Sequence, residues 1–263
     1  MTPVFRLIFG QGRRPALALL SAAALLLGGC RHESVVPEPV TDYFPVVVGT
    51  YRTYAVADST WASARVTVST YQLRERVAEQ FTDAAGQPAY RLVRSRRLTS
   101  ADAWRDDSVL VVRVLPRAVV LTRNNQRAVE LVYPVRANKA WNRTAFTVAG
   151  GNLGAPDTIT NLTRTYGPAV GTAYSTPATP GAAAQSYAAT VLTKDILPVG
   201  AEDINERDKR GQRQVYAQGV GLVLRRRFSL QTFTTASNGI ETNTKDVQNG
   251  VARYEVLIDA GTI

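Results

Sequence analysis

The chain has 263 residues, with 31 lysines and arginines against 21 acidic residues, a net charge of +10, one cysteine and one histidine. A single cysteine excludes an intramolecular disulfide and a multi-cysteine metal site. The single histidine, His32, lies two residues after Cys30, so a histidine-based triad or zinc site inside a folded domain is also excluded. We therefore expect no catalytic residue, no metal site and no cofactor, and we predict that the protein is not an enzyme.

The first 29 residues have the layout of a secretory signal peptide. A basic stretch ending at Arg14 is followed by an apolar run at residues 16–27 and by two glycines. The run has 12 residues, whereas a helix needs about 20 apolar residues to cross the hydrocarbon of a membrane. We expect it to be removed rather than kept as a transmembrane anchor.

The cleavage site resembles the bacterial lipobox, which here comprises Leu27, Gly28, Gly29 and Cys30. The resemblance implies cleavage before Cys30 and acylation of that residue with chains such as palmitate. Each buried methylene contributes roughly 0.8 kcal/mol, and two or more chains anchor a protein stably. The alternative is an ordinary secretory peptide whose cleavage site happens to precede a cysteine.

These features predict a lipid-anchored protein of the cell envelope, held at the outer membrane. Arg31 does not resemble the aspartate that retains many lipoproteins at the inner membrane, and the periplasmic and surface faces both remain open. Cleavage removes three arginines and no acid, so the net charge falls from +10 to +7. Besides the membrane itself, we expect an envelope protein, an anionic lipid or a glycan as the partner of this basic chain. We expect no nucleic acid as a partner. The alternative is that the arginines cover the wet face of a sheet.

The mature chain predicts a mainly β, single antiparallel domain, built as a curved sheet, half-barrel or sandwich with at most short helices. Apolar and polar residues alternate with period two at residues 65–77, as in a strand with one wet face. Residues 118–122 and 128–133 flank an asparagine-containing turn and predict a hairpin. Further strand-like segments are residues 43–57, 90–98, 108–115, 187–193, 215–217, 219–233 and 251–258. Short helices are possible at residues 102–107 and 198–210.

The predicted domain organisation has three parts. Residues 1–29 form the lipoprotein signal peptide, residues 30–40 an acylated tether with two prolines, and residues 41–263 the β-rich domain. Residues 150–186 are rich in Gly, Ala, Pro, Thr and Ser, which predicts a low-complexity loop or insertion.

Two motifs carry a resemblance to a family. YFPVVVGTYRTY at residues 43–54 and YAQGVGLV at residues 216–223 are similar to segments near the start and end of uncharacterised cell-envelope lipoproteins of Bacteroidota. The resemblance implies an envelope lipoprotein with a β-rich fold and supplies no catalytic residue. Independently, Gly219 and Gly221 permit a bulge or a close backbone approach.

The run Arg225, Arg226 and Arg227 is the candidate anion-binding site. In a strand the outer two side chains share one face and the middle one points to the other. Arginine forks suit phosphate or carboxylate groups. The structural alternative is a charged edge that resists strand addition.

Three functions remain open from the sequence. The first is a non-enzymatic, lipid-anchored binding or structural module, and the second is a carrier of lipids or amphiphiles with an apolar cavity. The third is a glycan hydrolase that uses carboxylates alone, which needs two acids facing each other across a groove. A deep apolar cavity would distinguish the second from the first.

Overall fold

The computed structural model describes residues 43–146, 162–196, 208–237 and 240–263. Within these ranges the chain is all β and contains no helix, which confirms the predicted mainly β, antiparallel domain built on a curved sheet. No described segment forms a helix long and apolar enough to cross a membrane. The predicted signal peptide, Cys30 and the tether lie outside the described residues.

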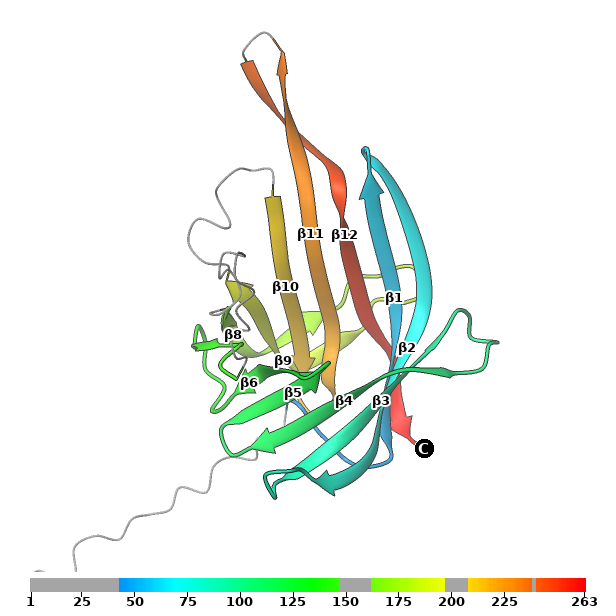
Figure 1. Cartoon of the computed structure of the whole chain (residues 1–263), viewed down its shortest axis with the longest axis vertical. Helices are drawn as coiled ribbons and strands as arrows, with labels where there is room; N and C mark the ends of the chain where they lie inside the picture. The colour runs from blue at the N-terminus through cyan, green and yellow to red at the C-terminus, as the bar shows by residue number, and fades with distance from the viewer. Residues whose placement is uncertain (1–42, 147–161, 197–207, 238–239) are drawn as a thin grey trace, which may run out of the picture. The chain divides into compact units, whose positions relative to one another are not determined.

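A single sheet contains every strand of the described chain (Figure 1). The strands are β1 (Thr50–Ala62), β2 (Arg65–Thr82), β3 (Pro88–Arg97), β4 (Arg105–Leu115), β5 (Ala118–Arg123), β6 (Gln126–Val132), β7 (Ala140–Asn142), β8 (Thr163–Ser175), β9 (Ser186–Ile196), β10 (Asp208–Ala217), β11 (Gly221–Ser237) and β12 (Ile240–Thr262). Their order is β6-β5-β4-β3-β2-β1-β12-β11-β10-β9-β8-β7. Pairing of the first strand with the last, from Thr50 opposite Thr262 to Trp61 opposite Gly250, therefore joins two meanders.

The sheet curls until its two edges meet, so that it is nearly closed and barrel-like. At this seam the backbone N–H of Val129 donates to the carbonyl of Arg143 at 2.8 Å, and the Trp141 indole donates to the Val129 carbonyl at 3.0 Å. The Tyr166 hydroxyl donates to the carbonyl of Val132 at 2.7 Å and accepts from its N–H at 3.0 Å. One side chain thus satisfies backbone groups that a neighbouring strand would otherwise pair.

The strands differ in length, so the sheet is nearly closed only at the end where all of them are present. At the other end only the longer strands continue, and the sheet is open. β3 pairs with β2 only from Gln72 onward, and residues 65–71 of β2 continue without it. β1, β11 and β12 continue with β2 past the shorter strands, as Figure 1 shows. The result is a nearly closed lower part and an open, curved upper part.

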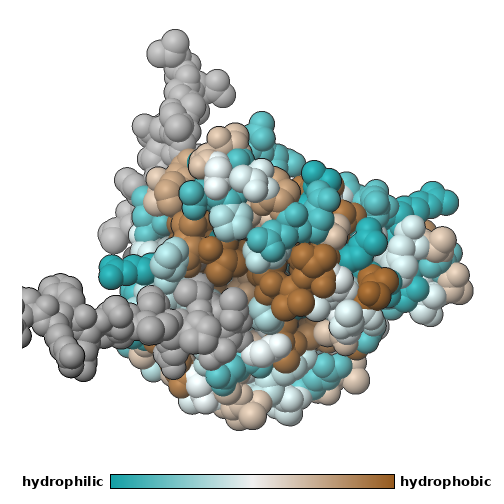
Figure 2. All heavy atoms as spheres, turned by 90° about the horizontal axis from the view of Figure 1, so that it is seen from below, coloured by the Kyte–Doolittle hydropathy of each residue, from teal (hydrophilic) through white to brown (hydrophobic). Residues whose placement is uncertain are grey.

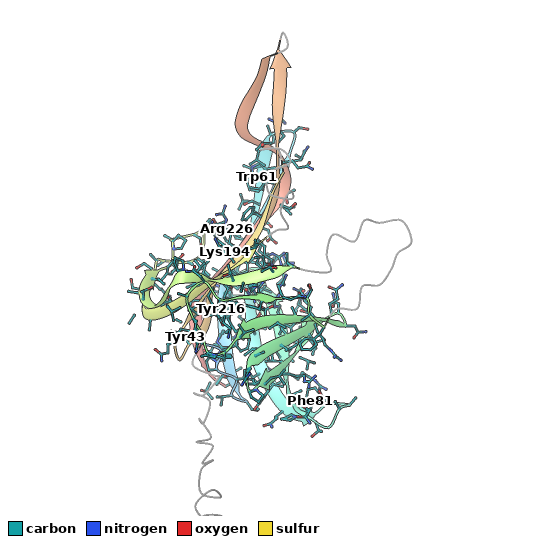
Figure 3. The ribbon with its side chains drawn as sticks, turned by 90° about the vertical axis from the view of Figure 1, so that its left-hand side faces the viewer. Tyr43, Trp61, Phe81, Lys194, Tyr216 and Arg226 are labelled. Atoms are coloured by element: carbon teal, nitrogen blue, oxygen red, sulfur yellow. The ribbon has the colours of Figure 1, made fainter. Side chains whose placement is uncertain are left out.

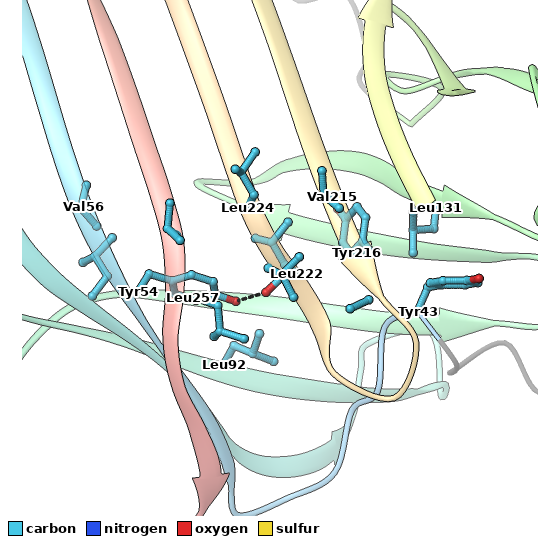
Figure 4. Close-up of a cluster of buried hydrophobic side chains, with 14 of the residues drawn as sticks. Tyr43, Tyr54, Val56, Leu92, Leu131, Val215, Tyr216, Leu222, Leu224 and Leu257 are labelled. Atoms are coloured by element: carbon cyan, nitrogen blue, oxygen red, sulfur yellow. Dashed lines mark hydrogen bonds between the residues drawn. The ribbon is translucent and has the colours of Figure 1, made fainter. Parts of the chain in front are cut away.

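Large apolar side chains fill the lower end of the interior (Figure 4). Tyr54, Leu222 and Leu257 come from three adjacent strands and are at most 4 % exposed. The Tyr54 hydroxyl donates to the carbonyl of Leu222 at 3.2 Å, so its polar atom is satisfied in this environment. Burial of each such side chain contributes roughly 1.5–3 kcal/mol.

The two sequence motifs meet at this lower end. Arg52, in the first motif, donates from Nε to the carbonyl of Val220 and from Nη2 to that of Pro45, both at 2.6 Å. Gly221 has φ +96°, and a Cβ there would lie 2.9 Å from Arg52 Nε. The glycine is needed both for its backbone conformation and for the close approach of the arginine.

Two local expectations are wrong. β8 occupies Thr163–Ser175, inside the segment predicted as a loop or insertion, because Tyr166 and Val170 supply strand contacts despite the small residues around them. Residues 102–107 do not form a helix, since β4 begins at Arg105 and the Asp102 carboxylate accepts bonds from Thr99 that hold a turn. Residues 147–161 and 197–207 lie outside the described residues, and residues 208–210 belong to β10 rather than a helix.

We expect Tyr166→Phe to lower the free energy of unfolding by about 1–3 kcal/mol, because it leaves the N–H and carbonyl of Val132 without this partner at the seam. Urea denaturation measures the change. Tyr187→Phe is the control, since its hydroxyl bonds only to the nearby Gln185 side chain. Equal stability of Tyr166→Phe and the unmodified protein would show that the hydroxyl does not hold the seam.

Candidate functional site: an arginine-lined pocket inside the sheet

Alternation along β11 directs its three arginines to two faces. Arg225 and Arg227 both reach the carboxylate of Glu255, which is fully buried inside the sheet. Arg226 points to the outer face, where its guanidinium lies 4.8 Å from the Phe228 ring centroid and 5.1 Å from that of Tyr254. Figure 3 shows Arg226 above the level of Tyr216. The sequence run therefore supplies two interior arginines and one outer arginine.

The first buried ion-pair cluster joins β2, β3, β11 and β12. Arg225 Nη1 lies 2.7 Å from Glu255 Oε2 and 3.9 Å from Glu75 Oε1, while Arg227 Nη2 lies 3.4 Å from Glu255 Oε1. Arg94 pairs with Glu75. All of these side chains except Arg227 are at most 9 % exposed, so the pairs lie away from water.

The second cluster crosses the seam between β6 and β8. Arg164 is buried and donates to Glu130 at 2.7 Å and to Asp195 at 2.6 Å. Gln214 and Tyr216 of β10 also donate to Glu130, at 3.2 and 3.3 Å. This single carboxylate therefore connects strands from the two halves of the sheet.

The arginines keep these carboxyl groups ionised. Burial by itself would raise the pKa of Glu255, but the charges of Arg225, Arg94 and Arg227 outweigh burial and hold that pKa at about 2. Burial would likewise raise the pKa of Glu130, but the charge of Arg164 lowers it more, so this pKa is also about 2. Neither group is protonated near neutral pH, so neither is suited to act as a general acid.

A polar pocket of about 220 Å³ opens above these clusters. Its charged lining consists of Arg94, Arg123, Arg143, Arg225, Arg227 and Glu130. The β5–β6 hairpin contributes Arg123 to the wall, and β11 contributes Arg225 and Arg227 to the opposite side.

Positive charge exceeds negative charge around this pocket. Five arginines and one carboxylate, Glu130, line the pocket. With Arg164 behind the wall and the nearby carboxylates of Glu75, Asp107, Asp195 and Glu255, six arginines stand against five acids among the described residues. Burial and the charge of Arg225 lower the pKa of Arg227 to about 10.

Two further observations show guanidinium groups without enough partners. Burial, with the charges of Arg94 and Arg225, lowers the pKa of Arg123, which forms no ion pair with any described residue. The Nε atoms of Arg94 and Arg143 are buried and have no hydrogen-bond partner. The described chain therefore does not fully satisfy these guanidinium groups.

Among the described residues, apolar side chains pack the interior below the polar layer. The space between the two layers, bordered by Phe44, Tyr54 and Leu92, amounts to about 10 Å³, which is about the volume that one water needs. This space is too small for an acyl chain. Among the described residues, no group of three or more histidine, cysteine or acidic side chains could hold a metal ion.

Sequence reasoning found two of the pocket arginines and missed the others. Arg94, Arg123 and Arg143 are distant in sequence, and nothing in their local patterns shows that they meet. One signal was available: Glu75 lies between Leu73 and Val77 on the face that alternation assigns to the interior, where a charge needs a partner.

Comparisons with protein-family models, curated proteins and solved structures find no match to this chain.

We expect Glu255→Gln to lower the free energy of unfolding at pH 7 by about 3–5 kcal/mol, because it leaves Arg225 buried without its main partner. Glu255 has a pKa of about 2 in the folded chain against an ordinary value of 4.5. Its stabilising contribution is thus fully present above about pH 4.5 and is lost as the pH falls toward 2. The variant lacks this part of the acid dependence, which urea denaturation at pH 7, 4.5 and 3 measures.

Glu79→Gln is the matched control. Glu79 forms a 2.7 Å ion pair with Arg91, but both side chains are about half exposed, and such pairs contribute about 0–1 kcal/mol. If the two variants were equally stable, the buried cluster would not have the energetic weight assigned to it.

Proposed function

We propose that the protein is a lipid-anchored binding protein of the cell envelope that holds an anionic ligand in the arginine-lined pocket and does not change it chemically. The observation that carries the proposal is the excess of positive charge around a pocket lined by five arginines and one carboxylate, Glu130. Preformed, partly dehydrated arginines bind phosphate or carboxylate strongly because little reorganisation is needed.

The interior favours this function over a lipid carrier or a glycan hydrolase. A carrier needs an apolar cavity of some hundreds of Å³, and the space between Phe44, Tyr54 and Leu92 is about 10 Å³. A hydrolase needs one carboxyl group that is protonated near neutral pH, whereas Glu130 and Glu255 are both held ionised by arginines.

The lower end of the sheet suits attachment to a membrane. The described chain begins there at Tyr43, and the C-terminus lies at the same end in Figure 1, where the backbone N–H of Ile263 donates to the carbonyl of Gly49 at 2.8 Å. Val47, Val48 and Ile263 are 58, 46 and 68 % exposed in the same region, and Figure 2 shows apolar patches on the face seen from below. A lipid on Cys30 would place this face toward the bilayer and the arginine-lined pocket away from it.

The first test is the binding of inorganic phosphate, measured by calorimetry at low salt. We expect Arg227→Gln and Arg123→Gln each to weaken binding about tenfold, because each removes a charged donor of the pocket. Arg227 is 37 % exposed on its side chain and Arg123 is half-buried, so both variants are expected to fold.

Arg226→Gln is the control, since Arg226 is adjacent in sequence to Arg227 but points to the other face. It should leave phosphate binding unchanged. If phosphate did not bind, or if Arg226→Gln weakened binding as much as Arg227→Gln, the proposed pocket would be wrong.

The second test concerns the anchor. We expect the mature N-terminal peptide from membrane fractions to carry acyl mass on Cys30, and Cys30→Ser to release an unacylated protein into the soluble fraction. Mass spectrometry of both fractions measures this. An unmodified, soluble product beginning at another residue would contradict the lipid anchor.

A further inference from the structure

A second cavity shares Arg227 with the arginine-lined pocket. It has a volume of about 440 Å³ and is formed by three adjacent strands, with residues 58–60 of β1, 227–229 of β11 and 251–253 of β12. The register pairs Asp58 with Arg253 and Thr60 with Val251. We call this cavity the upper groove.

The upper groove lies on the same face of the sheet as the pocket. Side chains two residues apart in a strand share a face, so Arg227 and Ser229 lie on the face of Arg225, and Arg253 lies on that of Glu255. Arg227 lines both cavities. A ligand that places an anionic group in the pocket can therefore extend past Arg227 into the upper groove.

The size of the pocket makes such an extension necessary for most ligands. Binding sites for small molecules usually have volumes of about 300–1,000 Å³, and the pocket alone has about 220 Å³. It accommodates one anionic group, and the rest of the ligand must lie in the adjoining space. The upper groove is the space that shares an arginine with it.

Five of the six side chains that this face directs into the groove are polar, although carbon atoms make up more of the exposed lining than polar atoms. Thr60 and Ser229 each offer a hydroxyl that donates and accepts. Asp58 and Arg253 form a two-fold ion pair, with Nε to Oδ1 at 2.6 Å and Nη2 to Oδ2 at 2.7 Å. The Tyr71 hydroxyl also donates to Asp58 Oδ2, at 3.0 Å. The carboxylate can accept further hydrogen bonds and the guanidinium can only donate them. Val251, 54 % exposed, is the large apolar side chain of this face.

These donors and acceptors fit the hydroxyl groups of a sugar ring, whereas an alkyl chain would leave them without partners. The five arginines that line the pocket suit a phosphate monoester, which carries about −1.5 to −2 charges at pH 7. Resting on the proposed function, we infer that the ligand is a sugar that carries a phosphate, with the phosphate among the arginines and the ring in the upper groove.

The test compares three probes with the same phosphate group in calorimetric titrations of the full mature chain: inorganic phosphate, hexyl phosphate and glucose 6-phosphate. We expect glucose 6-phosphate to bind at least tenfold more tightly than the other two. The combined Thr60→Val and Ser229→Ala variant should lose about fivefold or more of that advantage. Thr82→Val, an exposed threonine at the far end of β2, is the matched control.

Each outcome separates the ring site from the anion site. If all three probes bind equally, or if hexyl phosphate binds most tightly, the sugar inference is overturned while the anion pocket stands. If none of the three binds, the proposed function itself fails. An oligosaccharide phosphorylated on its terminal ring then separates two sources of the same chemistry: tighter binding than glucose 6-phosphate identifies an envelope glycan, and weaker binding identifies a free sugar phosphate.

Discussion

The enclosure of ionised side chains inside the sheet is the constraint on which the rest of the structure depends. A charge removed from water is tolerated only with a partner in good geometry. Glu255 must therefore meet Arg225 across β11 and β12, and Glu130 must meet Arg164 across the seam. Because each pair joins different strands, this requirement specifies which strands face one another as well as how tightly they pack.

The same requirement divides the interior into levels. Tyr54, Leu222 and Leu257 make the lower end an ordinary apolar core, and the carboxylate clusters above it would be costly without their arginines. The arginines in turn outnumber the acids, so the upper surface of the polar layer carries positive charge that the chain does not neutralise. In the proposed function, folding stability and anion binding draw on the same side chains, so an anion that fills the pocket should also stabilise the folded chain.

The seam gives a second physical reason for the form of the site. β6 and the strands opposite it are not joined by a continuous ladder, and Tyr166, Trp141 and the Glu130 cluster connect them instead. These side chains close the seam, and the pocket lies between the β5–β6 hairpin and β11.

The sequence by itself determined the class of fold and the two faces of the arginine run, because strand alternation is a local property with period two. It also predicted the lipid anchor at Cys30, outside the described residues, and the role of Gly221 in a close approach. It did not show that β8 lies within the small-residue segment, since packing around Tyr166 overrides weak local propensity. Only the tertiary structure decided that Arg94, Arg123 and Arg143 join Arg225 and Arg227, because curling the sheet sets residues distant in sequence around one space, and no local pattern records which of them will face each other.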